Sequence, residues 1–374
     1  EDLPVNGRNI LNLTALVPGV VPQGTTDGNA ITGKNIFAAG NYQIGGGQAN
    51  QGAVYYDGVP ANSALANLVN MVPSPDAIAE FRVQTNSMTA EFGRNSLQAN
   101  VATKSGTNAI HGSLSEFYRG SALSSQPVEE KVNDLPKGRF VRNVFGASLG
   151  GPIIKDKTFY FGAFEGTRVR STGRNFYYVP TQQFFDNAST NMQDYLQAGG
   201  GVPQPLLPDV LTPINILIAE GAITDASQYN TGLNTDGIPT ALFTSGTTNA
   251  IAADTPLYQR TYTSVPIDAG GGLAQDAWSV FGRVDHQFSD RTNLGGRWAW
   301  YRRLSPVGSG SDSPFSEFNT ESNFRSQNAS LVLTHAFSAQ LFNETRVGYS
   351  RTIPDAPLGQ GDPNVMCFTY GFSG

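Results

Sequence analysis

The chain contains few charged residues and a single cysteine. Asp, Glu, Lys and Arg together make up 14% of its 374 residues, compared with about 25% in ordinary soluble domains. A lone cysteine, Cys367, excludes an intramolecular disulfide framework and a metal site built from cysteines alone. The net charge of −6 gives no sign of the basic surface with which proteins bind nucleic acid, so nucleic acid is not an expected partner.

Long apolar runs are missing as well. No stretch approaches the roughly 18 consecutive apolar residues that a membrane-spanning helix requires. This lack does not exclude a membrane location, because the strands of a transmembrane β-barrel alternate apolar and polar residues and leave only a weak hydropathy signal. Glycine is abundant instead, with 42 residues, which is above its usual share of about 7%. Together with many Asn, Ser, Thr and aromatic residues, this predicts a β-rich, loop-rich protein rather than a helical enzyme.

The first hundred residues predict a small domain of mixed structure. Leu11, Leu13 and Leu16 can share one face of a helix that ends before Pro18. Further on, an Asp-Gly turn follows a short β-rich segment, and two later segments alternate apolar and polar residues as half-buried strands do. These four segments are Val54–Tyr56, Asp57–Gly58, Ile78–Thr85 and Gln98–Lys104. We expect residues up to about 105 to fold apart from the strands that follow.

From Ile110 onward the sequence divides into seven candidate strands. They are Ile110–Arg119, Arg139–Gly150, Thr158–Arg168, Ala277–Phe288, Leu294–Arg302, Arg325–Phe337 and Leu341–Thr352. The connections between them are alternately long and short, as in outer-membrane barrels, which have short periplasmic turns and long outer loops. The pattern therefore predicts antiparallel strands of a transmembrane barrel wall.

The alternation of residues within the strands also predicts which way their side chains point. A charged residue that faces lipid costs about 2–4 kcal/mol at the bilayer midplane, so the apolar face must be the outer one. We expect one set of residues to face outward, toward lipid: Trp278, Trp298 and Trp300. We expect another set to face inward: Arg283, Asp285, Arg297, Glu344 and Arg346.

One connection, residues 171–275, far exceeds the length of about 12–15 residues beyond which loops are uncommon. Asn191–Ala198 and Pro213–Glu220 are predicted to be short helices, each followed by a glycine that can end it. We expect this loop to lie outside the cell, to fold in part and to contact substrate. The alternative is a surface insertion without a role.

Few residues could carry covalent chemistry. Gly146-Ala-Ser-Leu-Gly150 matches the G-x-S-x-G elbow of esterases, but that elbow needs a strand, a sharp turn and then a helix, and Gly151-Pro152 follows here. The histidines, His111, His286 and His335, are far apart, and no zinc-binding motif accompanies them. His286 and His335 are typical of the membrane interface, where amphipathic rings lie. We expect no catalytic residue, no cofactor and no metal.

Several motifs, in order, resemble the N-terminal part of TonB-dependent outer-membrane receptors, most closely the Oar-like branch. They are Leu3–Ile10, Val54–Pro60, Ala90–Arg94, Asn100–Asn108 and His111–Tyr118. The resemblance implies an α+β plug domain in residues 1–108, followed by antiparallel transmembrane β-barrel strands in residues 109–374, with the loop 171–275 on the extracellular side. Because these receptors have 22 strands, the barrel in this chain would be incomplete.

Two features depart from the family pattern. The family usually carries Gly-Gly near the position of Leu97-Gln98, so the turn there is expected to differ in shape. A TonB box is not visible before Leu3, and the chain opens at Glu1 without a signal peptide. Since an outer-membrane protein must be exported, we expect a trimmed or partial sequence.

The resemblance also implies a function, which is energy-coupled uptake through the outer membrane of a Gram-negative-type bacterium. The substrate would be too large for porins, of the glycan, peptide or siderophore class. The implied partners are the TonB energy-transducing complex, outer-membrane lipid and an unknown extracellular substrate. The candidate substrate-contacting residues are Tyr55, Tyr56 and Asp57 in the plug and Phe176, Tyr177 and Tyr178 in the long loop.

Two alternatives stay open. A structural or adhesive outer-membrane barrel would keep the strand pattern but would not need a plug, so deletion of residues 3–107 would leave it unaffected. A secreted β-sandwich enzyme would need a convergent polar pocket and would be soluble and monodisperse without detergent.

Overall fold

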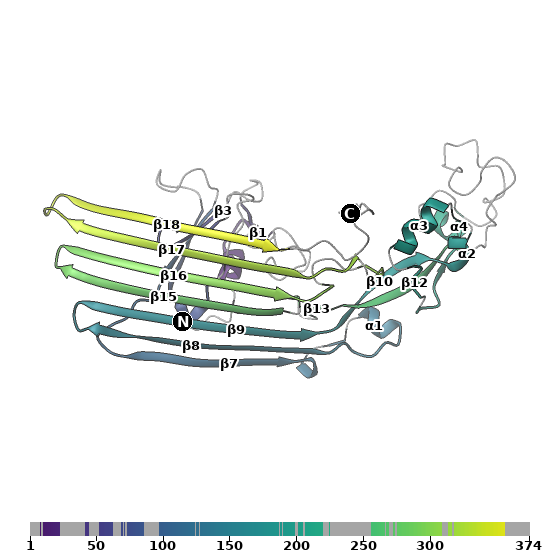
Figure 1. Ribbon diagram of the computed structural model, residues 1–374, viewed down its shortest axis with the longest axis horizontal. Coiled ribbons are helices and arrows are strands. Elements are labelled where there is room, and N and C mark those ends of the chain that lie inside the picture. Colours follow the sequence, from purple (N-terminus) through teal and green to yellow (C-terminus); the bar gives the residue numbers. More distant parts are fainter. Residues whose placement is uncertain are drawn as a thin grey trace. The chain divides into compact units, whose positions relative to one another are not determined.

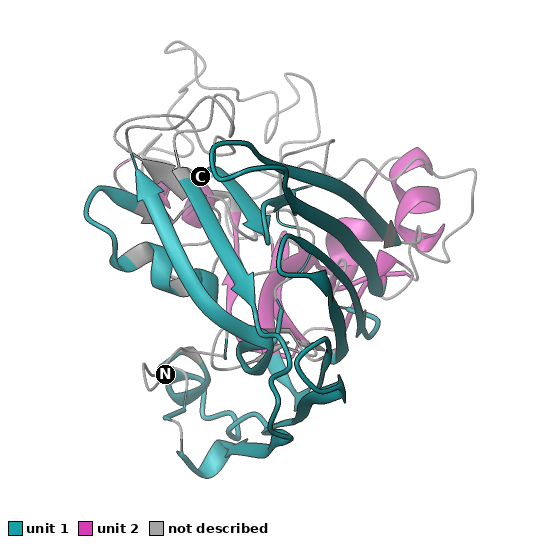
Figure 2. Ribbon diagram, turned by 90° about the vertical axis from the view of Figure 1, so that its left-hand side faces the viewer, with its two compact units in different colours: residues 1–173, 266–310, 321–357 teal, residues 174–265, 311–320, 358–374 magenta. Residues whose placement is uncertain are grey.

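In a computed structural model the protein divides into two compact units (Figure 2). Unit 1 comprises residues 1–173, 266–310 and 321–357, and unit 2 comprises residues 174–265, 311–320 and 358–374. The structure describes residues 8, 10–22, 42–44, 52–62, 69, 71, 73–85, 97–123, 125–126, 128–186, 188, 190–198, 201–204, 206–219, 224, 256–265, 267–268, 272–273, 275–308, 313–315 and 318–355. The predicted motif Ala90–Arg94 lies outside these residues.

Unit 1 is built on a seven-stranded antiparallel sheet, which we call the wall (Figure 1). Its order is β18-β17-β16-β15-β9-β8-β7. The bounds are β7 (His111–Gly120), β8 (Phe140–Ile154), β9 (Thr158–Ser171), β15 (Gln275–Ser289), β16 (Thr292–Ser305), β17 (Ser322–Ala336) and β18 (Phe342–Asp355). All seven strands predicted from the sequence are confirmed. In the described part of the chain the wall is an open sheet that ends at β7 and β18.

The connections of the wall alternate in length as predicted. The short ones, residues 155–157, 290–291 and 337–341, join β8 to β9, β15 to β16 and β17 to β18 at one end of the sheet (Figure 1). The long ones, at the other end, hold four small elements of unit 1. These are η5 (Ser121–Leu123), α1 (Val128–Val132), β13 (Ile267–Asp268) and β14 (Gly272–Leu273).

The register of the wall confirms the predicted orientation of its side chains. Residues directly opposite one another in an antiparallel pair share a face, and Arg283 pairs with Arg297 while Gly282 pairs with Trp298. The Arg297 side chain is 3% exposed on the inner face, whereas Trp298 is 44% exposed on the outer face. Period-two alternation extends these two assignments along each strand, so the tryptophans lie outside and the charged set lies inside.

The N-terminal residues of unit 1 form a separate four-stranded mixed sheet, which we call the N-terminal sheet. Its order is β4-β3-β6-β5, with β3 and β6 parallel. The bounds are β3 (Gly52–Tyr56), β4 (Val59–Pro60), β5 (Ile78–Thr85) and β6 (Leu97–Thr103). A short 3-10 helix, η3 (Pro75–Ala77), precedes β5, and a small hairpin of β1 (Val20–Pro22) and β2 (Tyr42–Ile44) lies earlier in the chain. The predicted strands of this region are therefore confirmed.

The predicted helix near the N-terminus differs in type. Residues Ile10–Leu16 form a 3-10 helix, η2, in which residues three apart share a face. Leu11 is buried with Thr14, whereas Leu16 is 74% exposed. The prediction that Leu11 and Leu16 share one face is wrong, because it assumed the 3.6-residue period of an α-helix.

The N-terminal sheet packs on the inner face of the wall. One buried cluster joins Val54, Tyr56 and Val101 of the sheet to Phe161 and Phe281 of the wall. The rings of Phe161 and Phe281 lie 6.2 Å apart between centroids, close enough for a favourable tilted contact. This apolar contact fixes which face of the sheet meets the wall.

Unit 2 holds most of the long segment between β9 and β15. Its three-stranded sheet has the order β10-β12-β11, with β10 (Gly173–Pro180), β11 (Val210–Leu211) and β12 (Tyr258–Val265). The helices are α2 (Gln182–Asp186), α3 (Thr190–Ala198) and α4 (Pro213–Ala219), which confirms both predicted helices. Of the helices in the described ranges, none is long and apolar enough to cross a membrane.

Two glycines of the wall that face opposite ways allow a matched test of this packing. A Cβ added to Gly348 on the inner face would lie 2.3 Å from Cγ1 of Val59, whereas a Cβ added to Gly282 on the outer face would meet nothing within 4 Å. We expect Gly348→Ala to lower the free energy of unfolding by about 1–3 kcal/mol, as overpacking does. Gly282→Ala is expected to change it by less than about 0.5 kcal/mol. Denaturant unfolding of the intact protein in detergent measures both, and equal effects would contradict the docking described here.

Candidate functional site

The turn between β3 and β4 is the point where the N-terminal sheet meets the charged part of the wall. Asp57 and Gly58 both have positive φ, 47° and 77°, which is the conformation of a two-residue hairpin turn that favours Asp-Gly. A Cβ at Gly58 would lie 2.0 Å from Nη1 of Arg346. The positive φ of Gly58 favours glycine here, and the missing side chain leaves room for the guanidinium of Arg346.

Asp57 joins the N-terminal sheet to two arginines of the wall. Its Oδ2 atom lies 2.8 Å from Nε of Arg297, and its Oδ1 atom lies 3.6 Å from Nη1 of Arg283. Thr103 of β6 donates to the same carboxylate from its backbone N (2.9 Å) and its Oγ1 (2.7 Å). The carboxylate of Asp57 thus binds both strand β6 of its own sheet and the arginines of the wall.

Arg297 is a buried cation whose other donors are also used. Its Nη2 donates to the backbone oxygen of Tyr56 at 2.6 Å, and its Nη1 donates to Oδ1 of Asn328 at 2.7 Å. The guanidinium carbon lies 5.9 Å from the centre of the Tyr56 ring, within the range of a cation–π contact. A buried charge is costly unless it is paired and hydrogen-bonded, and here Asp57 meets that requirement.

Arg283 carries the network from Asp57 to Asp285. It donates from Nε and Nη2 to the two oxygens of Asp285, at 2.8 and 3.0 Å, and from Nη1 to the backbone oxygen of Thr103 at 3.1 Å. Ser105 donates to Asp285 at 2.5 Å. Two carboxylates and two guanidinium groups therefore alternate in a neutral chain, which we call the Asp57 network (Asp57, Arg283, Asp285 and Arg297).

A second polar contact holds the N-terminal segment to β9. Arg8 lies 2.7 Å from Asp76 and 3.0 Å from Glu165, and Ser74 donates to Glu165 at 2.9 Å. The guanidinium of Arg8 also lies 4.6 Å from the ring centre of Phe117. The sequence analysis missed this contact, although a glutamate in the largely apolar strand β9 was a signal that a cation would face it.

The structure buries the candidate substrate-contacting tyrosines of the N-terminal sheet. Tyr55 and Tyr56 are both buried, and Tyr56 is 2% exposed. Its hydroxyl donates to the backbone oxygen of Met71, and burial raises the pKa of Tyr56, which keeps the hydroxyl protonated as a donor. The carboxylate of Asp57 is paired with Arg297. A role of these residues in substrate contact stays a prediction, and it requires the turn to leave the wall first.

The other candidate residues lie on β10 of unit 2. The Phe176 ring contacts Tyr262 at 6.1 Å between centroids, and the guanidinium of Arg260 lies 4.8 Å from its centre. Tyr178 is 48% exposed. Of the three aromatics, Phe176 is thus packed within the small sheet, while Tyr178 is accessible to a ligand. The two candidate sets lie in different units, and their contact with substrate stays a prediction.

The segments considered for catalysis have other roles in the described residues. Gly146–Gly150 lies inside β8, and Ser148 Oγ lies 2.8 Å from Ser113 Oγ of the neighbouring strand, so the segment does not have the strand–turn–helix geometry of an elbow. Nδ1 of His286 and of His335 each lies 2.8 Å from a threonine hydroxyl of the adjacent strand. Each ring also packs edge-on against the phenylalanine two residues later. Within the described ranges, no group of three or more metal-ligating side chains was found.

A double-mutant cycle on Asp57 and Arg297 tests whether the network holds the N-terminal sheet. We expect Arg297→Gln alone to destabilise the protein by about 3–5 kcal/mol, because it leaves a carboxylate without its buried partner. The coupling energy with Asp57→Asn is expected to be about 1–3 kcal/mol. Thermal and denaturant unfolding of the intact protein in detergent give these values.

The matched control for this cycle is the ion pair between Arg170 and Asp276. It has the same distance, 2.8 Å, but the Arg170 side chain is 56% exposed. An exposed pair is expected to show a coupling energy below about 1 kcal/mol. If both pairs gave the same coupling energy, burial of the Asp57 network would not matter for stability.

Comparison with known proteins agrees with this architecture. The family model described as an outer membrane beta barrel domain matches residues 102–372. The TonB-dependent transporter Oar of Myxococcus xanthus is 30% identical over 133 residues, which are 34% of this chain and 12% of that protein. The solved outer membrane transporter YddB from Escherichia coli has a similar fold, with a TM-score of 0.51 at 13% identity, over 93% of this chain and 37% of that one.

The chain therefore spans about an eighth of the Oar transporter and somewhat over a third of the solved transporter. These proteins are transporters, and the family model covers most of the chain, including every strand of the wall. The outer-membrane barrel family expected from the sequence motifs is therefore confirmed. The protein belongs to the outer-membrane β-barrel family and is located in the outer membrane.

Proposed function

We propose that this chain is the plug and the first seven barrel strands of a TonB-dependent receptor of the Oar-like branch. The receptor takes up, by energy coupling, a substrate too large for porins, of the glycan, peptide or siderophore class. The N-terminal sheet, with the residues before it, is the plug, and the long connections of the wall face outward from the cell. The Asp57 network carries this proposal, because it fixes a small folded domain to the inner face of a barrel wall by ion pairs.

The wall supports the proposal by its open edges. Unpaired backbone groups at a sheet edge cannot be satisfied in lipid, so a transmembrane barrel must close. The chain covers 37% of the transporter whose fold it shares, which leaves room for further strands. We therefore propose that strands outside this chain complete the barrel around the plug.

In this mechanism the Asp57 network is the point of release. Hydrogen bonds need close and aligned atoms, and water that enters between separated charges weakens their attraction, so a pull on the N-terminal sheet by the TonB complex breaks these contacts within a short displacement. When Asp57 leaves, Arg283 keeps its two bonds to Asp285, whereas Arg297 loses the one carboxylate that it pairs with in the described part of the chain. The buried charge on Arg297 then favours return of the turn, so that the closed state is restored after each cycle.

A reversible crosslink between plug and wall tests whether the plug must move. A Cβ built at Gly348 would lie 3.4 Å from Cβ of Val59, close to the roughly 3.5–4.5 Å separation found in disulfides. We expect the variant Val59→Cys with Gly348→Cys to lose uptake when oxidised and to regain it on reduction, while surface binding of substrate persists. Uptake by cells, with crosslinking scored by gel mobility after a protease cut between the two cysteines, is the measurement.

The variants Val59→Cys and Gly348→Cys, each of which adds one cysteine to the native Cys367, are the controls, and each should transport under both conditions. Normal uptake by the fully crosslinked receptor would show that this side of the plug does not leave the wall.

Deletion of residues 3–107 gives a further comparison. A structural or adhesive barrel would keep its surface function after that deletion, whereas the receptor would lose controlled uptake.

Substitutions at Tyr178 and Phe176 distinguish a residue that contacts substrate from one that stabilises the fold of unit 2. Since Tyr178 is exposed and Phe176 is packed between Tyr262 and Arg260, their substitutions should differ. We expect Tyr178→Ala to weaken substrate binding about tenfold, as loss of one stacking contact of about 1–2 kcal/mol does, without a change in melting temperature. Phe176→Ala should lower the melting temperature as well. Unchanged binding by Tyr178→Ala would remove this residue from the proposed site.

A further inference from the structure

The outer face of the wall contains a hollow at positions where side chains are missing. Gly162 of β9 and Gly282 of β15 lie directly opposite one another, and Gly296 of β16 lies opposite Val284. All three are on the outer face by the register established above. A Cβ at Gly282 would meet nothing within 4 Å, and the nearest atom to one at Gly162 would be a backbone oxygen 3.8 Å away. A Cβ at Gly296 would lie 3.0 Å from Cδ2 of Leu331, so the hollow is open at Gly162 and Gly282 and is bounded at Gly296.

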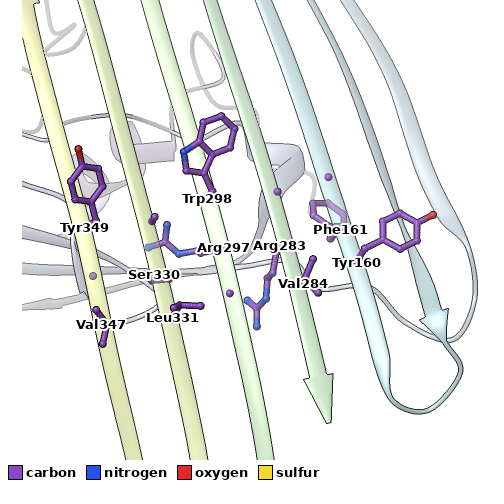
Figure 3. Close-up of a pocket in the computed structure, with 15 residues that line it drawn as sticks. Tyr160, Phe161, Arg283, Val284, Arg297, Trp298, Ser330, Leu331, Val347 and Tyr349 are labelled. Atoms are coloured by element: carbon purple, nitrogen blue, oxygen red, sulfur yellow. The ribbon is translucent and has the colours of Figure 1, made fainter. Parts of the chain in front are cut away.

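Apolar side chains surround this hollow, whose volume is about 620 Å³. Figure 3 shows Trp298 and Tyr349 toward one end and Val284, Leu331 and Val347 toward the other. These five side chains are exposed in the structure, on the face that meets lipid in an outer-membrane barrel. A groove of this kind on a membrane protein holds hydrocarbon, because an unfilled void loses the dispersion contacts of its lining.

A nearby glycine shows that the hollow is not a general property of this wall. Gly166 of β9, four residues along the strand from Gly162, also lies on the outer face. A Cβ there would lie 2.5 Å from the ring of Phe145, so this ring covers the backbone at Gly166. No side chain of the described residues covers Gly282 in this way. The Phe145 ring therefore fills the gap at Gly166, whereas the gap at Gly282 stays open.

Three arginines lie beyond the hollow on the side of the long connections. Arg302, Arg325 and Arg351 lie on the outer face of the consecutive strands β16, β17 and β18. Arg302 is four residues beyond Trp298, or about 13 Å along the strand, and Arg351 is two residues beyond Tyr349, or about 7 Å. The distances from the rim of the hollow to the arginines are therefore shorter than one lipid chain.

The three arginines lack carboxylate partners among the residues that the structure describes. The ion pairs found there use other cations, and Nε of Arg302 is buried without a hydrogen-bond partner. Arg302 and Arg325 are directly opposite one another, an arrangement in which like charges repel. An anion between them would remove that repulsion and satisfy the buried donor.

We propose that the outer face of β9 and β15–β18 is a binding site for one phosphate-bearing membrane lipid. The phosphate lies between Arg302, Arg325 and Arg351, and one acyl chain occupies the glycine hollow below. The two parts of the site lie on the same strands at the separation that a lipid headgroup and its chain require. The site is independent of the plug and of substrate uptake, since it lies on the opposite face of the wall from the Asp57 network.

Native mass spectrometry of the intact receptor in detergent tests the site. The probes are bisphosphorylated lipid A, its dephosphorylated counterpart and inorganic phosphate. We expect one tightly held copy of the phosphorylated lipid, weaker binding of the dephosphorylated lipid, and no displacement by inorganic phosphate. Binding should weaken about fivefold for each arginine removed in the variants Arg302→Gln, Arg325→Gln and Arg351→Gln. Gly282→Leu, which fills the hollow, should also abolish retention of the lipid.

Two matched variants serve as controls. Arg291→Gln removes an arginine from the short turn between β15 and β16, at the opposite end of the wall, and Leu333→Phe adds bulk to the outer face outside the hollow. Both should bind the lipid as the unchanged receptor does. Equal binding by the triple arginine variant would overturn phosphate recognition, and equal binding by Gly282→Leu would overturn the acyl site. Displacement of the lipid by inorganic phosphate, or a copurified protein in its place, would overturn the proposal as a whole.

Discussion

The ion pair between Asp57 and Arg297 is the contact on which the arrangement of unit 1 depends. Arg297 is buried, and burial of a guanidinium is unfavourable without a charged partner. That partner comes from a tight turn of a different sheet, and the turn can present it only because Asp57 and Gly58 adopt positive φ. The charged groups of the N-terminal sheet and of the wall therefore pair with one another, and each would lack its partner if the other sheet were absent.

Period-two alternation gives this wall two chemically different faces. On the inner face, arginines, carboxylates and amides bind the N-terminal sheet, and the apolar contact through Phe161 and Phe281 adds area to that interface. On the outer face, tryptophans and aliphatic side chains meet the membrane. Phe288 and Trp278 lie ten residues apart on β15, about 33 Å of strand, which at a tilt of about 40° spans the roughly 25 Å apolar band of an outer-membrane barrel.

The proposed uptake and the proposed lipid site use these two faces separately. Hydrogen-bonded ion pairs on the inner face suit a contact that must break and re-form, because their hydrogen bonds need close, aligned atoms and water weakens the attraction once the charges separate. Apolar contacts on the outer face suit a surface that stays in lipid throughout. In the proposed mechanism, coupling to the TonB complex provides the work of opening.

The sequence alone determined the strands of the wall, the side of β15, β16 and β18 that faces lipid, the Asp-Gly turn, and the helices α3 and α4 of unit 2. These features depend on local periodicity and on the residues of turns, both of which can be read directly from the sequence. It did not determine the partners of Asp57, the contact of Arg8 with Glu165, or the burial of Tyr55 and Tyr56. Those residues are brought together across separations of up to 241 positions, and no local pattern encodes such pairings. The hollow at Gly162 and Gly282 likewise exists only because the register of β9 and β15 places the two glycines side by side.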